Sequence, residues 1–163
     1  MDGSMLLHEF THEAQVTRTT LERVPFEKKE WSPHEKSYTL LQLAAHLAEI
    51  PGWTGVTVNQ DVFEMDGSYE PYVPETVDDL LEHFDQNVAK AREALEGASS
   101  ETLMEDWAMK QDGEVIMQMP KAAVLRSFVF NHMVHHRAQL GVYLRLLDIP
   151  VPATYGPSAD EAQ

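Results

Sequence analysis

The chain contains 163 residues, a length that favours one ordinary domain over two. Acidic side chains outnumber basic ones by 27 to 12, which gives a net charge of −15 with histidine neutral, so phosphate backbones and anionic membranes would be repelled. Hydrophobic residues make up 43% of the chain and charged residues 24%, which is too apolar for general disorder. We therefore expect one folded domain over residues 1–163 that binds neither nucleic acid nor membranes.

The sequence lacks both a membrane-spanning or export segment and cysteine, which limits the location of the protein and the chemistry of its sites. No apolar run approaches the roughly 18 residues that cross a bilayer, and residues 1–13 lack a basic segment followed by a hydrophobic one, so we expect a cytoplasmic protein. The chain has no cysteine, which excludes disulfides, thiolate metal sites and a cysteine nucleophile, and fits a reducing compartment. A metal site must therefore use nitrogen and oxygen ligands, and the eight histidines are its first candidates.

The first half of the chain reads as two helices. Apolar residues at steps of three, four and seven predict a helix over residues 6–24. Thr39 and Gln42 fit a capping box at the start of a second helix. Pro51 and the glycine after it predict a kink, beyond which we expect this helix to continue to Val62.

The second half adds two helices and a small hairpin. Residues 65–74 read as an ordered connection, and residues 76–97 carry the apolar spacing of a third helix. Residues 107–119 predict a β-hairpin that turns at Asp112 and Gly113, and residues 120–147 a fourth helix. The expected fold class is all-α, a four-helix bundle with a small β-hairpin between the third and fourth helices.

The strongest local signal is a pair of histidines in the fourth helix. His132 and His136 are four residues apart, so both project toward the apolar face of that helix and can reach one ion. Two buried imidazoles without a shared partner would be costly, whereas a cation accepts both lone pairs. His135 lies at the edge of this face and is a weaker candidate. His8 and His12 have the same spacing but lie opposite the apolar face of the first helix, so we expect them to face solvent.

A third ligand is available on the second helix. His46 lies within the apolar stripe of that helix; a lone inward histidine is usually satisfied by a hydrogen bond, but two other inward histidines favour a shared metal. Glu49 lies one turn later on the same helix. It could accept a hydrogen bond from a metal ligand, bind the metal itself as a fourth ligand or carry protons, or it could simply be a solvated helix residue. His83 lies off the stripe of the third helix and His34 in a loop, so neither is expected in the site.

Four more side chains near these motifs are candidates for roles in or around the site. Gln139, one turn beyond the histidine pair, either orients a ligand or water or forms a hydrogen bond between helices. Arg137 faces away from the pair, and we expect it on the surface or in a subunit contact. Trp53 or Tyr143 would contribute, with apolar neighbours, to the wall of a substrate pocket.

Three segments together resemble a known family. They are Trp31-x-Pro33-x-x-x-Ser37-x-Thr39-Leu40, His46-Leu-Ala-Glu49 and Asn131-His132-x-x-His135-His136-Arg137-x-Gln139-Leu140. This pattern is similar to that of the DinB superfamily, including its YfiT-like members, over almost the whole chain. The resemblance implies a three-histidine site of His46, His132 and His136 that binds a divalent metal such as nickel or zinc, and a homodimer. Relatives include S-transferases that use low-molecular-weight thiols, a thiol-dependent isomerase and presumed hydrolases.

Two hypotheses follow for the function. In the first, the chain is a metalloenzyme whose ion activates a thiol or water for reaction with a small-molecule substrate, as a thiol S-transferase or a hydrolase. Glu49 would then move protons. In the second, the metal only ties the second and fourth helices together, or the chain is a ligand-binding module without chemistry. A structural ion would be closed to solvent, whereas a catalytic one would keep an exchangeable position.

Overall fold

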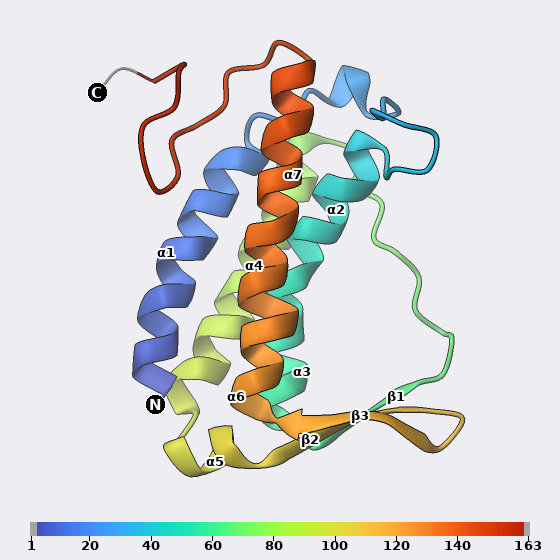
Figure 1. Cartoon of the computed structure of the whole chain (residues 1–163), viewed down its shortest axis with the longest axis vertical. Helices are drawn as coiled ribbons and strands as arrows, with labels where there is room; N and C mark the ends of the chain where they lie inside the picture. The colour runs from blue at the N-terminus through green and yellow to red at the C-terminus, as the bar shows by residue number, and fades with distance from the viewer. Residues whose placement is uncertain (1–2, 162–163) are drawn as a thin grey trace.

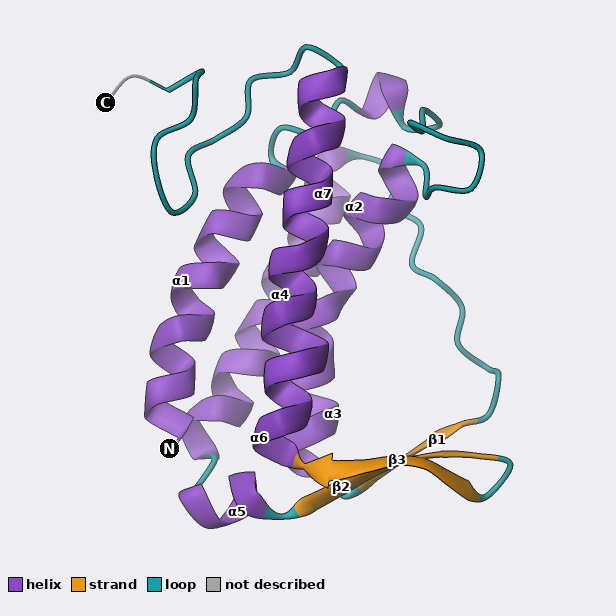
Figure 2. Cartoon of the chain, in the orientation of Figure 1, coloured by secondary structure: helices purple, strands orange, loops and turns teal. Residues whose placement is uncertain are grey.

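The computed structural model describes residues 3–161, which form long helices lying side by side with a small sheet at one end (Figures 1 and 2). The helices are α1 (Gly3–Leu21), α2 (Leu40–Glu49), α3 (Trp53–Asn59), α4 (Val77–Gly97), α5 (Ser100–Met104), α6 (Lys121–Val124) and α7 (His132–Leu146). The strands are β1 (Val62–Met65), β2 (Asp106–Gln111) and β3 (Glu114–Pro120). The chain is thus mostly helical with a small three-stranded sheet.

Polar caps start the helices that carry and support the site. The Thr39 hydroxyl accepts from the Gln42 amide at 3.2 Å, and the Gln42 side chain accepts from the Thr39 amide at 2.9 Å, which confirms the predicted capping box of α2. Thr76 accepts from the Asp79 amide at 3.1 Å and caps α4 in the same way. These bonds satisfy amides that have no partner within the helix.

The second predicted helix is interrupted and ends early. A 3₁₀ turn at Ile50–Gly52 joins α2 to α3, as expected from the proline within it. The prediction that the helix continues to Val62 was wrong, because Gln60 takes an extended backbone with φ −129° and ψ 156°. Val62 instead begins β1 and pairs with Ala108 of β2.

The sheet has one strand more than the sequence indicated. β2 and β3 pair antiparallel around a turn at Asp112 (φ 52°) and Gly113 (φ 80°), and β1 joins β2 in parallel. Two strands alone are marginal in water, and here the third strand and a buried lysine hold them to the helices. The Lys121 side chain is 3% exposed, and its ammonium contacts Asp61 at 2.8 Å, Glu105 at 3.1 Å and the Val58 carbonyl at 3.2 Å.

The predicted fourth helix is not a continuous α-helix. Residues Leu125–Asn131 form a π-helical segment between α6 and α7. A π turn holds more residues than an α turn, so α7 is rotated relative to the direction that α6 alone would give it. No apolar periodicity reveals such a turn, and the sequence analysis missed it. His132 is the first residue of α7 beyond it.

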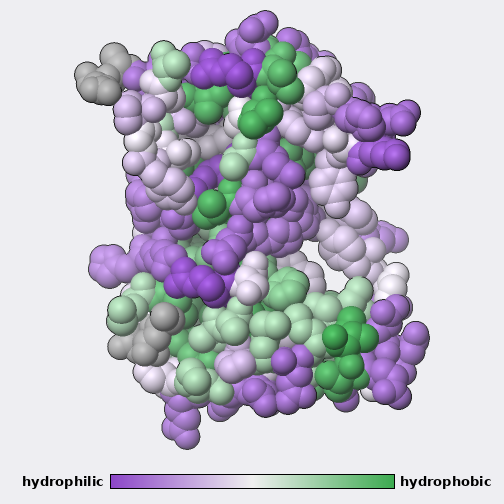
Figure 3. Space-filling model, viewed as in Figure 1, coloured by the Kyte–Doolittle hydropathy of each residue, from purple (hydrophilic) through white to green (hydrophobic). Residues whose placement is uncertain are grey.

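A single apolar cluster fills the space between the long helices. Its largest fully buried members come from α1, α2, α4 and the π segment, and they include Phe10, Leu47, Phe84 and Phe130. Within residues 3–161, no helix combines the length and the apolarity needed to cross a membrane. Figure 3 shows a hydrophilic middle of the molecule and a more apolar surface at the end that carries the sheet.

Candidate metal centre

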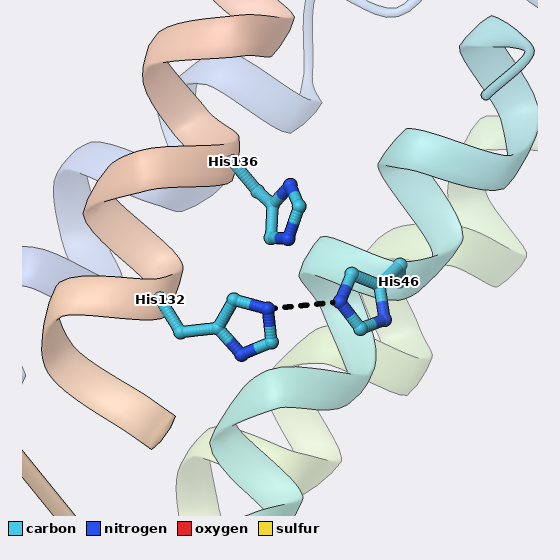
Figure 4. Close-up of side chains that lie close together, drawn as sticks. All are labelled: His46, His132 and His136. Atoms are coloured by element: carbon cyan, nitrogen blue, oxygen red, sulfur yellow. Dashed lines mark hydrogen bonds between the residues drawn. The ribbon is translucent and has the colours of Figure 1, made fainter. Parts of the chain in front are cut away.

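Three histidine rings from two helices meet between α2 and α7 (Figure 4). His46 comes from α2, and His132 and His136 from α7. The Nε2 atoms of His46 and His132 are 3.2 Å apart. The three ring centroids lie 4.6 to 5.0 Å from one another, and the candidate ligand nitrogens lie within 4.8 Å. All three side chains are half-buried, so the predicted convergence is present and the group is not sealed inside the core.

Hydrogen bonds to Nδ1 direct both histidines of α7. His136 Nδ1 lies 2.7 Å from Gln139 Oε1, and His132 Nδ1 lies 3.3 Å from the Phe128 carbonyl. Both partners are acceptors, so each Nδ1 carries the proton and each Nε2 keeps its lone pair for an ion. For Gln139, the predicted bond between helices is wrong, because its contact lies within one turn of α7, and that contact is with a candidate ligand.

The π segment explains why the Phe128 carbonyl is available. The backbone N–H of His132 donates to Val129, three residues back, instead of to Phe128, four residues back. In a regular α-helix the carbonyl four residues back would accept that amide. Here it lies beside the imidazole of His132 and accepts from Nδ1. The irregular turn therefore contributes directly to the orientation of one candidate ligand.

The surroundings keep the three imidazoles neutral at neutral pH. Burial, and then the charges of His136 and His132, lower the pKa of His46 to about 4. Burial is also the largest cause that lowers the pKa of both His132 and His136. A protonated imidazole cannot bind a metal, so these shifts keep the lone pairs available to a cation.

The donor set fits a divalent ion. Ligand nitrogens of a tetrahedral zinc site with bonds of about 2.0–2.1 Å lie roughly 3.3 Å apart, close to the 3.2 Å between His46 and His132. Within the part of the chain that the structure describes, the three histidines are the one cluster that could hold a metal ion, and no carboxylate belongs to it. Three protein ligands without a fourth are typical of catalytic rather than structural zinc sites.

Glu49 lies beside this cluster but is engaged elsewhere. Its Oε2 accepts from the Tyr69 hydroxyl at 2.9 Å, and its Oε1 accepts from the Tyr72 backbone amide at 3.3 Å. Glu49 is half-buried, so it is not simply a solvated helix residue. Neither partner was predicted, because both lie in a connection without helical periodicity.

The remaining histidines lie outside the cluster. His83 stacks on the Tyr72 ring with centroids 3.9 Å apart, and His34 Nδ1 accepts an amide hydrogen bond within its own loop. The ring of His135 is 4.9 Å from that of His136, but it is not one of the three convergent ligands. The exposed histidines include His8, His12 and His135. The solvent-facing prediction for the pair on α1 is therefore confirmed.

Arg137 is the clearest error of the sequence analysis. It was expected on the surface or in a subunit contact, but its side chain is 3% exposed and forms an ion pair with Glu13 of α1 within the same chain, at 2.7 Å. It also donates to the Thr17 hydroxyl at 3.1 Å and to the Tyr155 hydroxyl at 2.5 Å. Arg137 does face away from the histidines, but that direction leads to α1 and the C-terminal segment instead of solvent. A buried acid compensates the charge.

The two aromatic side chains expected to line a pocket lie in different surroundings. Tyr143 is 8% exposed and donates to the Tyr38 carbonyl at 3.1 Å, so it belongs to the core. Trp53 packs against Phe63 of β1, with centroids 5.0 Å apart. An aromatic side chain that does lie beside the cluster is Tyr38, which is 51% exposed with its ring 6.1 Å from that of His46. It precedes α2, where helical periodicity gives no information.

Comparisons with known proteins agree with this fold. The model of the DinB family matches residues 1–163. The uncharacterized protein YrdA of Bacillus subtilis (strain 168) is 26% identical over 156 residues, which span 95% of this chain and 89% of that protein.

Two solved structures resemble the chain in fold. A DinB-like protein from Bacillus cereus ATCC 10987 matches with a TM-score of 0.68 and 20% identity, over 91% of this chain and 95% of its own. The DinB-like protein YjoA from Bacillus subtilis matches with a TM-score of 0.71 and 19% identity, over 90% of this chain and 96% of its own.

Proposed function

Because the chain belongs to the DinB family, we propose that it binds a divalent metal, zinc or nickel, through His46, His132 and His136 and uses it as a metalloenzyme. The observation that carries this proposal is the convergence of three neutral imidazoles, whose candidate ligand nitrogens lie within 4.8 Å of one another with no carboxylate in the cluster. Sites made of histidine alone suit zinc, nickel, copper and iron, so the ligands limit the candidate metals but do not identify one.

The proposed reaction is a thiol S-transfer or a hydrolysis on a small-molecule substrate. Bound there, the metal would lower the pKa of a thiol or a water and stabilise the resulting anion. The thiol would be a low-molecular-weight cofactor, since the chain has no cysteine of its own. Gln139 and the Phe128 carbonyl hold the protons on Nδ1 of the two α7 histidines. Glu49 would accept a proton on a lone pair that its bonds to Tyr69 and Tyr72 leave free.

Metal loading and one substitution test the proposal. We expect metal-free protein to bind one equivalent of zinc or nickel, and His132→Ala to bind the ion at least tenfold more weakly. Loaded protein is then assayed for transfer of low-molecular-weight thiols to electrophiles and for ester and amide hydrolysis. The matched control is His8→Ala, which removes an exposed histidine of α1. Metal-dependent activity that survives in His132→Ala would reject the role assigned to this site.

The competing function is a metal that serves only the structure, or a ligand-binding module. Cobalt substitution separates it from the metalloenzyme, because the visible spectrum of cobalt reports coordination. Azide or a small thiol added to the cobalt protein should change the spectrum where a position is exchangeable. A spectrum that does not respond to either ligand would favour the structural role. The half-buried state of the three histidines favours the exchangeable site.

We further propose a cytoplasmic homodimer that binds neither nucleic acid nor membranes. The net charge of −15 supports the exclusion of polyanions. Val142 and Leu146, on the outer face of α7, are 58% and 57% exposed and supply apolar surface for a two-fold contact. Light scattering coupled to size-exclusion chromatography tests the dimer, and a mass of one chain at micromolar concentration would reject it.

A further inference from the structure

A segment between β1 and α4 is held against α2 by a single carboxylate. We call this segment, residues 66–76, the strap. Glu49 accepts from the strap with both oxygens, from the Tyr69 hydroxyl at 2.9 Å and from the Tyr72 amide at 3.3 Å. Because Glu49 lies three residues after His46, these bonds fix the strap within one helical turn of a candidate ligand.

The strap is otherwise anchored mainly at its far end. The Tyr72 hydroxyl donates to the Asp79 carbonyl at 3.1 Å, and its ring stacks on His83 of α4. Nearer β1 the strap is exposed and irregular. Tyr69 is 60% exposed, and Gly67 has a positive φ of 74° in a stretch without regular secondary structure. A segment with few buried contacts opens at a low free-energy cost. Loss of the Glu49 contacts should therefore release it without unfolding the bundle.

The strap approaches the histidine cluster through Tyr38. Tyr38, whose ring is 6.1 Å from that of His46, is also close to Tyr69. Burial, the bond to Glu49 and the charges of Glu49 and Tyr38 together raise the pKa of Tyr69 to about 12, so its hydroxyl stays a donor at neutral pH. In Figure 1 the strap runs beside α2 from the sheet to the start of α4, and Figure 3 shows a hollow between this edge and the helices.

We propose that Glu49 is a positioning residue that latches the strap beside the three-histidine site, so that release of the strap widens access to the histidines. The inference rests on the proposed function in assuming that substrate enters from this side. It assigns Glu49 a role that differs from proton transfer, since the two contacts that carry it hold the strap and involve no reacting group. Tyr69 then moves with the strap, next to Tyr38, whose ring lies 6.1 Å from that of His46.

Two measurements on metal-free protein test the latch independently of metal binding. The first is amide hydrogen exchange, in which Glu49→Ala should speed exchange at the Tyr72 amide about tenfold. The second is the rate at which diethyl pyrocarbonate modifies His46, measured by mass spectrometry relative to exposed His8 in the same molecule. Glu49→Ala should raise this ratio several-fold. Glu93→Ala, which removes an exposed carboxylate of α4, is the matched control and should change neither.

Two more variants separate the latch from other roles. Tyr69→Phe removes one of the two bonds and should raise both rates by less than Glu49→Ala does, whereas Glu49→Gln keeps an acceptor and should lie nearest the wild type. Exchange at Tyr72 that is unchanged in Glu49→Ala would overturn the latch, and faster exchange with an unchanged His46 ratio would overturn its link to access. Failure of the protein to bind metal would count against the proposed function alone, because neither readout involves an ion.

Discussion

Replacement of Arg137 by methionine should be among the most destabilising single changes outside the apolar core. The change removes a guanidinium that is 3% exposed and leaves the Glu13 carboxylate, whose side chain is 10% exposed, without its counter-charge. The remaining partner of that carboxylate is the Tyr155 hydroxyl, at 2.7 and 2.8 Å. A buried acid held by one neutral donor is poorly compensated, so the cost arises from the group left behind as well as from the bonds lost.

The magnitude follows from the geometry of the pair. At 2.7 Å and an effective dielectric constant near 20, the attraction between unit charges is about 6 kcal/mol, and desolvation of both groups offsets most of it. Removing only one partner of such a pair typically costs about 3–5 kcal/mol. With a urea m-value of roughly 2 kcal/mol/M, Arg137→Met should lower the unfolding midpoint by about 1.5–2.5 M. Replacing Glu13 by glutamine in the same chain should recover part of this loss, because no buried charge then remains.

The assay is equilibrium unfolding in urea, followed by far-ultraviolet circular dichroism on metal-free protein. The control is Arg126→Met, which breaks an ion pair between Arg126 and Glu9 of α1 whose side chains are 37% and 42% exposed. Exposed pairs contribute only about 0.2–1 kcal/mol. If Arg137→Met lowers the free energy of unfolding no more than this control does, the electrostatic interpretation of the buried pair is wrong.

Three other substitutions give shorter tests. Gln139→Leu removes the acceptor 2.7 Å from His136 Nδ1 and should weaken metal binding roughly 10–100-fold in a chelator competition, with unfolding unchanged; equal affinity would reject the orienting role. Lys121→Met should lower the free energy of unfolding in urea by about 2 kcal/mol. It should also loosen the sheet, so that an added quencher reduces Trp107 fluorescence more strongly than in the wild type. Quenching equal to that of the wild type would contradict the anchoring role of Lys121. The folded pKa of His46 lies near 4, below the roughly 6.5 of an unfolded histidine, so the unfolded chain binds the extra proton and metal-free protein should lose stability as pH falls from about 6.5 to 4. His46→Gln should flatten this part of the profile, and an identical profile would exclude the histidine as its cause.

The histidine cluster could be predicted because it depends on local helical geometry. His132 and His136 share a face with apolar residues of their own helix, and His46 lies within the apolar stripe of α2, so periodicity alone turns all three inward. The capping box at Thr39 and Gln42 is equally local and was predicted for the same reason. Such features need only a few neighbouring residues to be specified.

The features that were missed depend on partners distant in the sequence. Arg137 pairs with Glu13 across 124 positions, and a charged residue off the apolar face is assigned to the surface unless that partner is known. The parallel pairing of β1 with β2 joins strands separated by the whole of α4. Glu49 offered four readings in the sequence, and the contact with the strap that the structure reveals depends on a connection with no periodic pattern.

The π-helical segment before His132 makes the length of this stretch as important as its composition. A π turn holds more residues than an α turn, so deleting one residue of this segment ahead of Phe128 would let it close into a regular α-helix. The His132 amide would then donate to the Phe128 carbonyl, which now accepts from His132 Nδ1, although the sequence would still contain all three histidines. A residue inserted at the Gly113 turn, by contrast, would leave the register of α7 untouched. The number of residues in this stretch, and not only their identity, thus sets how one candidate ligand is oriented.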